Sequence, residues 1–62
     1  MIYIPKEVLQ LRLKAYRKKH GMRQEDLATK LHVAYTTVSR WERMIHKVSY
    51  AHFRLLQQEG IL

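Results

Sequence analysis

The chain has 62 residues, a length that allows one small domain and leaves little room for a deep enzyme active site. Hydrophobic residues make up 47% of it and charged residues 27%, with two glycines, one proline and no cysteine. This composition favours a compact, mostly helical protein, and it excludes disulfides and thiolate metal sites. Twelve Lys and Arg against five Asp and Glu give a net charge of +7, which favours nucleic acid, an anionic membrane surface or an acidic protein as partner.

No apolar run approaches the roughly 20 residues of a membrane span. The first five residues also lack the long apolar region and the cleavage site of a signal peptide. We therefore expect a cytoplasmic protein that is not embedded in a membrane.

A first helix is predicted over about residues 5–19. Leu9, Leu13 and Tyr16 recur there at helical spacing and form one apolar stripe. Basic residues crowd its last turn, where they favour the negative end of the helix dipole, and Gly21 provides a stop.

A second, short helix is predicted over residues 24–31. Two acidic residues stand in its first turn, on the favourable side of the dipole, while Leu27, Ala28 and Leu31 face inward. A three-residue turn then leads to a third helix over 35–42.

Val38 and Trp41 are the expected buried pair of the third helix. Ser49 is a good N-cap for a fourth helix over about 50–58, in which Phe53 and Leu56 face the core. The expected fold class is therefore all-α, with four helices and one core over residues 1–62.

Two short helices joined by a three-residue turn make a helix-turn-helix arrangement. Residues 24–42 resemble the helix-turn-helix of the Xre family, which includes the Cro and repressor proteins of lambdoid phages, and the resemblance extends over roughly residues 9–56. Its strongest matches are Gly21, Gln24, Leu27, Ala28, Leu31, Val33, Thr36, Thr37, Val38, Ser39 and Glu42. Three positions depart from the family pattern: Arg23 replaces a Thr or Ser cap, and His32 and Met44 replace glycines.

The outward side of the third helix carries the expected base contacts. In such proteins the N-terminal part of this helix enters the major groove of DNA. We expect Tyr35, Thr36 and Arg40 to contact bases: Arg40 can bind guanine O6 and N7, and Thr36 can meet a base edge or a thymine methyl. Tyrosine is a less usual base contact, and the alternative for Tyr35 is a contact with a phosphate.

Phosphate contacts are expected at both ends of the helix-turn-helix. The resemblance implies that Gln24, with the N–H groups of the second helix start, binds a phosphate. The resemblance also implies that Arg17 and Glu42 pair between the first and third helices, without touching DNA. Further phosphate contacts are expected from the residues that flank the third helix or lie on its edge, which are Arg23, Thr37, Arg43, His46 and Lys47.

No enzyme, metal or cofactor chemistry is predicted. The four histidines show no i, i+4 pair of a helical zinc site, and no glycine-rich phosphate loop is present. The best-supported function is a sequence-specific regulator that binds double-stranded DNA, similar to a Cro-like or small repressor of a phage or mobile element. Two alternatives remain: a protein-interaction module such as an anti-repressor, and a membrane-surface or RNA-binding peptide.

The outward side of the third helix separates these classes, because it has no acidic residue before Glu42, whereas an anti-repressor should be acidic there. No small-molecule ligand is expected in so short a chain. One recognition helix reads few base pairs, so a homodimer, at least on DNA, is the expected working form. The expected contacts are the apolar ends of the chain, unless these fold back onto its own core: Ile2, Tyr3, Ile4, Leu55, Ile61 and Leu62.

Overall fold

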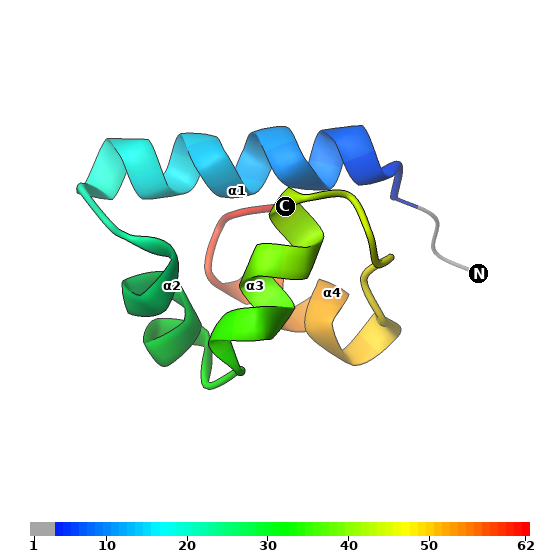
Figure 1. The fold of residues 1–62 in the computed structure, drawn as a ribbon. Coiled ribbons are helices and arrows are strands. Elements are labelled where there is room, and N and C mark those ends of the chain that lie inside the picture. Colours follow the sequence, from blue (N-terminus) through cyan, green and yellow to red (C-terminus); the bar gives the residue numbers. More distant parts are fainter. Residues whose placement is uncertain (1–3) are drawn as a thin grey trace.

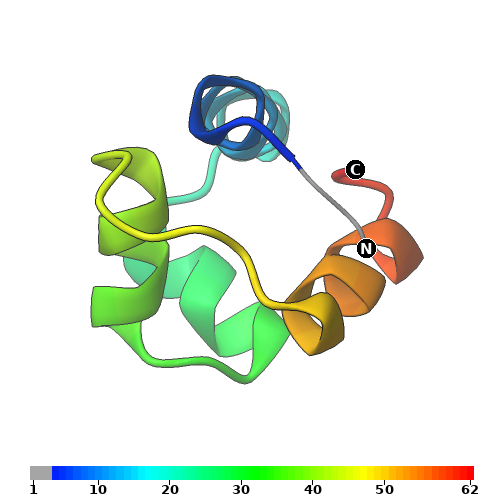
Figure 2. The same ribbon diagram turned by 90° about the vertical axis from the view of Figure 1, so that its right-hand side faces the viewer.

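A computed structural model describes residues 4–62 of the chain. Within these residues there are four α-helices and no strand: α1 (Lys6–His20), α2 (Gln24–Leu31), α3 (Tyr35–Glu42) and α4 (Tyr50–Gln58). In Figure 1, α1 lies across the top of the other three helices. Seen almost along α1 in Figure 2, α3 and α4 lie on opposite sides, with α2 between them. The predicted all-α, four-helix fold is therefore confirmed.

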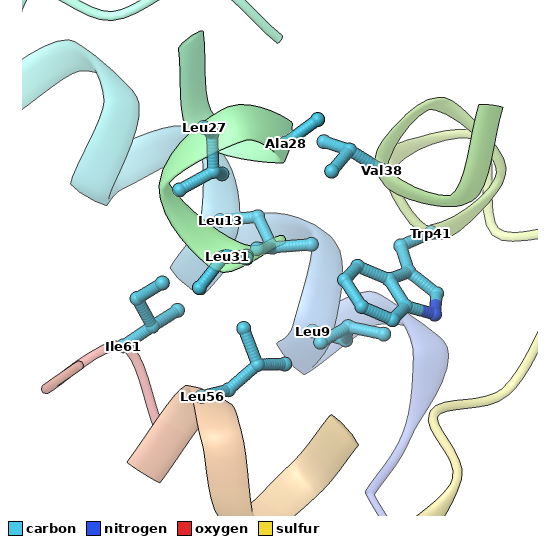
Figure 3. Packing of buried hydrophobic residues seen from close by; sticks show 9 residues of the cluster. All are labelled: Leu9, Leu13, Leu27, Ala28, Leu31, Val38, Trp41, Leu56 and Ile61. Atoms are coloured by element: carbon cyan, nitrogen blue, oxygen red, sulfur yellow. The ribbon is translucent and has the colours of Figure 1, made fainter. Parts of the chain in front are cut away.

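The core is built from every helix. The side chains of its nine buried hydrophobic residues point toward one another in Figure 3. Because each helix contributes one apolar stripe, no pair of helices can bury its apolar surface alone, and the four must fold together. The buried hydrophobic residues are Leu9, Leu13, Leu27, Ala28, Leu31, Val38, Trp41, Leu56 and Ile61.

Two expectations about the core need correction, and one alternative left open is decided. Tyr16 and Phe53, both placed in the core, are only half-buried. Ile61, expected as a dimer contact unless the chain end folds back onto its own core, is 3% exposed and belongs to the core, so the fold-back alternative holds for it. It is buried because Gly60 turns the chain back, so that the Ile61 N–H donates to the Leu56 carbonyl at 2.9 Å. Two other expected contacts, Ile2 and Tyr3, lie outside the described residues.

All four helices end in the same kind of turn. After each helix one residue adopts the left-handed conformation, and the N–H of the residue after that donates to a carbonyl five positions back. This is the Schellman motif, which satisfies carbonyls that the helix end leaves open. The left-handed residues are Gly21 (φ 64°), His32 (φ 58°), Met44 (φ 59°) and Gly60 (φ 79°).

The Schellman motif normally places an apolar residue directly after the left-handed one, in contact with the helix it ends. Met22, Val33 and Ile61 fill this position after α1, α2 and α4, and all three pack in or against the core. After α3 the same position is Ile45, which is 50% exposed. The chain therefore leaves α3 along the surface, and residues 43–49 cross to α4 as an open loop, drawn in yellow-green and yellow in Figure 1.

Candidate nucleic-acid interface

The outer side of α3 is exposed. Tyr35 is 48% exposed, and Thr36 and Arg40 are also exposed. These residues lie opposite Val38 and Trp41, which fix the inner side of α3 in the core. In Figure 1 the first turn of α3 lies at the far end from α1, beside the turn that joins α2 to α3. The fold thus presents the N-terminal part of α3 as a projecting edge.

Arg17 and Glu42 hold the other end of α3 against α1. Arg17 Nε lies 2.7 Å from Glu42 Oε2, and Arg17 Nη2 lies 2.6 Å from Glu42 Oε1. The Glu42 side chain is 2% exposed and that of Arg17 is 21% exposed. This parallel, two-bond geometry fits a planar guanidinium to a carboxylate and fixes the direction of both side chains.

Two further hydrogen bonds tie the same ion pair into the fold. Gln10 Nε2 donates to the Glu42 carbonyl at 2.9 Å, and Arg17 Nη1 donates to the Met22 carbonyl at 3.3 Å. The guanidinium therefore connects three segments: α1, the turn before α2, and the last residue of α3. The inner end of α3 is held by charge and hydrogen bonds as well as by packing.

The start of α2 brings two of the expected phosphate contacts together. Gln24, the first residue of α2, is half-buried, and Arg23 caps the helix with extended backbone. A guanidinium cannot accept a hydrogen bond, so the Arg23 side chain leaves the N–H groups of the helix start unsatisfied. Asp26 satisfies one donor of this cap, because its carboxylate accepts from the Arg23 N–H at 3.0 Å.

Charge interactions at the start of α2 are exposed. The Arg23 side chain is 73% exposed and contacts Asp26 at 3.3 Å and Glu25 at 3.8 Å. Hydrogen bonds from the Arg23 N–H and then from its side chain hold the pKa of Asp26 below its usual value. The hydrogen bond with Asp26 in turn raises the pKa of Arg23. Arg23 is thus partly neutralised by its own helix.

The remaining expected contacts lie on the edge of α3 or directly after it. Arg43 directly after it, and His46 and Lys47 in the loop, are exposed, while Thr37 is half-buried on the edge of the helix. A hollow of about 230 Å³ lies between α3, this loop and the start of α4, and we call it the α3–α4 hollow. Its lining residues are Thr37, Arg40, Trp41, His46, Lys47, Ser49 and His52.

Sequence reasoning did not assign Ser49 and His52 to this surface. Ser49 was expected only as the cap of α4, and it does cap the helix, because its Oγ accepts from the His52 N–H at 3.3 Å. That cap places the side chain of the third helical residue beside the cap oxygen. Three residues after a serine cap, His52 was therefore recognisable as a neighbour of the cap.

A second hollow, of about 440 Å³, lies between α1 and residues 59–61. Arg12, Tyr16 and Lys19 line it from α1, and Glu59 lines it from the end of α4. Among residues 4–62 no group of three His, Asp or Glu side chains could hold a metal ion. In the same residues, no helix is both long and apolar enough to span a bilayer.

The sequence matches the helix-turn-helix family over residues 13–58, from the middle of α1 to the end of α4. The chain belongs to this family, of the Xre, Cro and lambda-repressor type. No curated protein and no solved structure gives a significant match. Members of the family are DNA-binding regulators and are not typically enzymes, so the helix-turn-helix described above is a DNA-binding element.

Two of the three departures from the family pattern fall at left-handed helix ends of this helix-turn-helix. His32 and Met44 both have φ near +60° without being glycine. Histidine is among the residues enriched at such angles, whereas a methionine there is unusual. Both positions therefore have the left-handed backbone that glycine adopts most readily, with a less suitable side chain.

Proposed function

We propose that residues 1–62 act as one domain that binds specific sites on double-stranded DNA, as a Cro-like or small repressor of a phage or mobile element in the cytoplasm. One observation carries the proposal: the outer side of α3 exposes Tyr35, Thr36 and Arg40 while its inner side is fixed in the core. A rigid helix with exposed polar groups is what major-groove reading requires.

Base recognition is assigned to three residues of α3. Arg40 donates two hydrogen bonds to guanine O6 and N7, the commonest specific contact in the major groove. Thr36 contacts a base edge or a thymine methyl group. Tyr35, at the first position of the helix and 48% exposed, contacts a base or the phosphate next to it.

Phosphate binding is assigned to both ends of the helix-turn-helix. Gln24 and the N–H groups of the α2 start bind one strand, because a helix start carries unsatisfied donors and positive potential. The Arg23 side chain lies beside them. On binding DNA it releases its contact with Asp26 and contacts a phosphate instead. The remaining contacts come from the edge of α3 and the loop after it: Thr37, Arg43, His46 and Lys47.

A homodimer on DNA follows from the size of the reading surface. One α3 covers only a few base pairs, and two copies on a two-fold site, with half-sites about 34 Å apart, give the specificity that a genome demands. Of the apolar ends, Ile4, Leu55 and Leu62 pack against the core but are only half-buried, so part of their apolar surface stays open to a second copy.

Selection of bound sites from random duplex DNA, in about 0.15 M salt, tests the proposal. We expect an enriched site with two-fold symmetry. Arg12→Ala is the matched control, because it removes one positive charge from the second hollow, away from α3, and should select the same site. Recovery of no enriched sequence would overturn sequence-specific binding and favour the protein-interaction module.

A further inference from the structure

The α3–α4 hollow has the lining of an anion site. Two hydroxyl groups, from Thr37 and Ser49, and four basic side chains border it, and none of the five acidic residues of the chain lines it. A water molecule occupies about 30 Å³ of liquid. The hollow, at about 230 Å³, therefore has room for a phosphate group together with bridging waters.

His52 is held in a fixed position within this lining. Its Nδ1 lies 3.0 Å from Ser49 Oγ, and its ring meets the Trp41 ring edge-on, with centroids 5.3 Å apart and an interplanar angle of 74°. Trp41 is 2% exposed and anchored in the core. Since Nδ1 faces the cap oxygen, Nε2 is the ring nitrogen that a ligand in the hollow can reach.

Resting on the proposed function, we propose that the α3–α4 hollow binds one backbone phosphate of DNA and that protonated His52 is one of its ligands. Ser49 orients the imidazole through Nδ1, and Nε2–H donates to a phosphate oxygen. Arg40 borders the site from α3, and His46 and Lys47 border it from the loop, so every charged or titratable group that lines it is basic.

The proposal makes DNA binding depend on pH in one direction. Histidine is the side chain that ordinarily changes charge between pH 5 and 8. A phosphate favours the charged imidazole. His52 therefore takes up a proton on binding DNA at any pH at which it is neutral in the free protein. Affinity for DNA therefore falls as the pH rises from 6 to 8.

The experiment measures the affinity of the full chain for duplex DNA at pH 6, 7 and 8 and constant ionic strength. Because a phosphate contact is independent of sequence, random duplex is sufficient, and a selected site serves as a second probe. We expect the wild-type chain to bind roughly three- to sixfold more tightly at pH 6 than at pH 8, the range given by a rise of about 0.6 to 1 unit in an ordinary histidine pKa of about 6.5 when the phosphate binds.

The test variant is His52→Asn, whose amide can still meet Ser49 Oγ but cannot become charged. The matched control is His20→Asn, since His20 lies in the last turn of α1 and lines the second hollow. We expect His52→Asn to lose most of the pH dependence and His20→Asn to keep it. A thermal melt of each variant, followed by circular dichroism, verifies that it is folded at each pH.

The variant His46→Asn measures how much of the remaining pH dependence comes from His46, the second histidine that lines the hollow. Equal pH dependence in His52→Asn and the wild type would overturn the assignment of His52, while DNA binding itself would stand. No binding of any duplex by the wild type at any pH would instead overturn the proposed function, and this inference with it.

Inorganic phosphate distinguishes a site for any phosphate from one that needs the DNA backbone. In NMR titrations of the histidine rings, we expect millimolar phosphate, at constant ionic strength, to raise the titration midpoint of His52 and to leave that of His20 unchanged. A change with DNA but not with free phosphate also supports the proposal and restricts the ligand to the DNA backbone. No change at His52 with either ligand would overturn it.

Discussion

On its inner side α3 buries Val38, Trp41 and Glu42, whereas on its outer side Tyr35, Thr36 and Arg40 are exposed. The two sides alternate along only eight residues. The inner side is held by packing and by a two-bond ion pair with α1, and in residues 4–62 no buried side-chain nitrogen or oxygen lacks a hydrogen-bond partner. The outer side instead borders the α3–α4 hollow.

This difference separates stability from recognition within one short helix. A change on the inner side should lower the free energy of unfolding and affect DNA only through the amount of folded protein. A change on the outer side should alter binding and leave unfolding almost unaffected, because exposed substitutions usually change stability by less than about 0.5 kcal/mol.

Trp41→Ala should produce one of the two largest losses of stability. Removing a buried tryptophan leaves a cavity that the core fills only in part, and we expect a cost of about 3–5 kcal/mol. For a small domain this is a large share of the total stability. Urea unfolding followed by circular dichroism measures it, with Arg40→Ala as the outer-side control on the preceding residue. A melt of Trp41→Ala that matches the wild type would remove Trp41 from the core.

Breaking the ion pair should reveal an asymmetry between its two members. Arg17→Met leaves a carboxylate that is 2% exposed without its partner, whereas Glu42→Met leaves a guanidinium that water can reach. We expect Arg17→Met to cost about 3–5 kcal/mol, the usual result of stranding a buried charge, and Glu42→Met to cost less.

A double-mutant cycle measures the coupling of Arg17 with Glu42, and the cycle for Arg23 with Asp26 is its control. The exposed pair should show a much smaller coupling, because solvent screens its charges. Similar coupling in both cycles would mean that burial does not distinguish the two pairs.

On the outer side, Arg40→Ala and Lys47→Ala should weaken DNA binding in different ways. Loss of a guanine contact should cost roughly 1–3 kcal/mol on a selected site and relax the preference at one base pair. Loss of a phosphate contact should weaken all sequences alike and reduce the salt slope by about one unit. Equal weakening of selected and random duplex by Arg40→Ala would remove its role in base reading.

Much of the fold was predictable from local patterns. The positions of α2, α3 and α4 follow the apolar periodicity, and α1 differs by one residue at each end. It begins at Lys6 because Pro5, with ψ 140°, does not have helical backbone, and it continues to His20, directly before the left-handed Gly21. The burial of Ile61 was also predictable in principle, since Gly60 followed by an apolar residue is the Schellman pattern. The half-burial of Tyr16 and Phe53 was not, because periodicity gives the side of a helix and not how far its neighbours cover it.

The candidate site was predictable in its parts and not in its arrangement. The outer residues of α3 follow from helical spacing. The α3–α4 hollow depends on how residues 43–49 cross from one helix to the next, and that path is set by tertiary contacts. Local patterns alone therefore identified His46 and Lys47 as separate phosphate contacts, without Ser49 and His52 beside them.

Met44→Gly and His32→Gly should each stabilise the fold. Their side chains are held at φ near +60°, where an L-residue other than glycine is strained by about 1–2 kcal/mol. Part of that gain is lost to the greater freedom of glycine in the unfolded chain, so we expect about 1 kcal/mol, or roughly 4–8 °C in Tm. Arg43→Gly, at φ −89° beside Met44, is the control and should destabilise. A lower Tm in both Met44→Gly and His32→Gly would contradict the expectation that their left-handed backbone is strained.

The smallest effect concerns the exposed Arg23–Asp26 pair and its response to acid. The Arg23 N–H and then its side chain lower the pKa of Asp26, so the folded state favours the ionised carboxylate. That contribution to stability is complete above the ordinary Asp value of about 3.9, and it disappears as the pH falls through the lower folded-state pKa. NMR titration of the Asp26 carboxyl carbon should therefore give a midpoint below the ordinary value. Arg23→Ala should bring it only part of the way back, because the backbone hydrogen bond, the larger cause, remains. A full return in Arg23→Ala would instead assign the shift to the guanidinium.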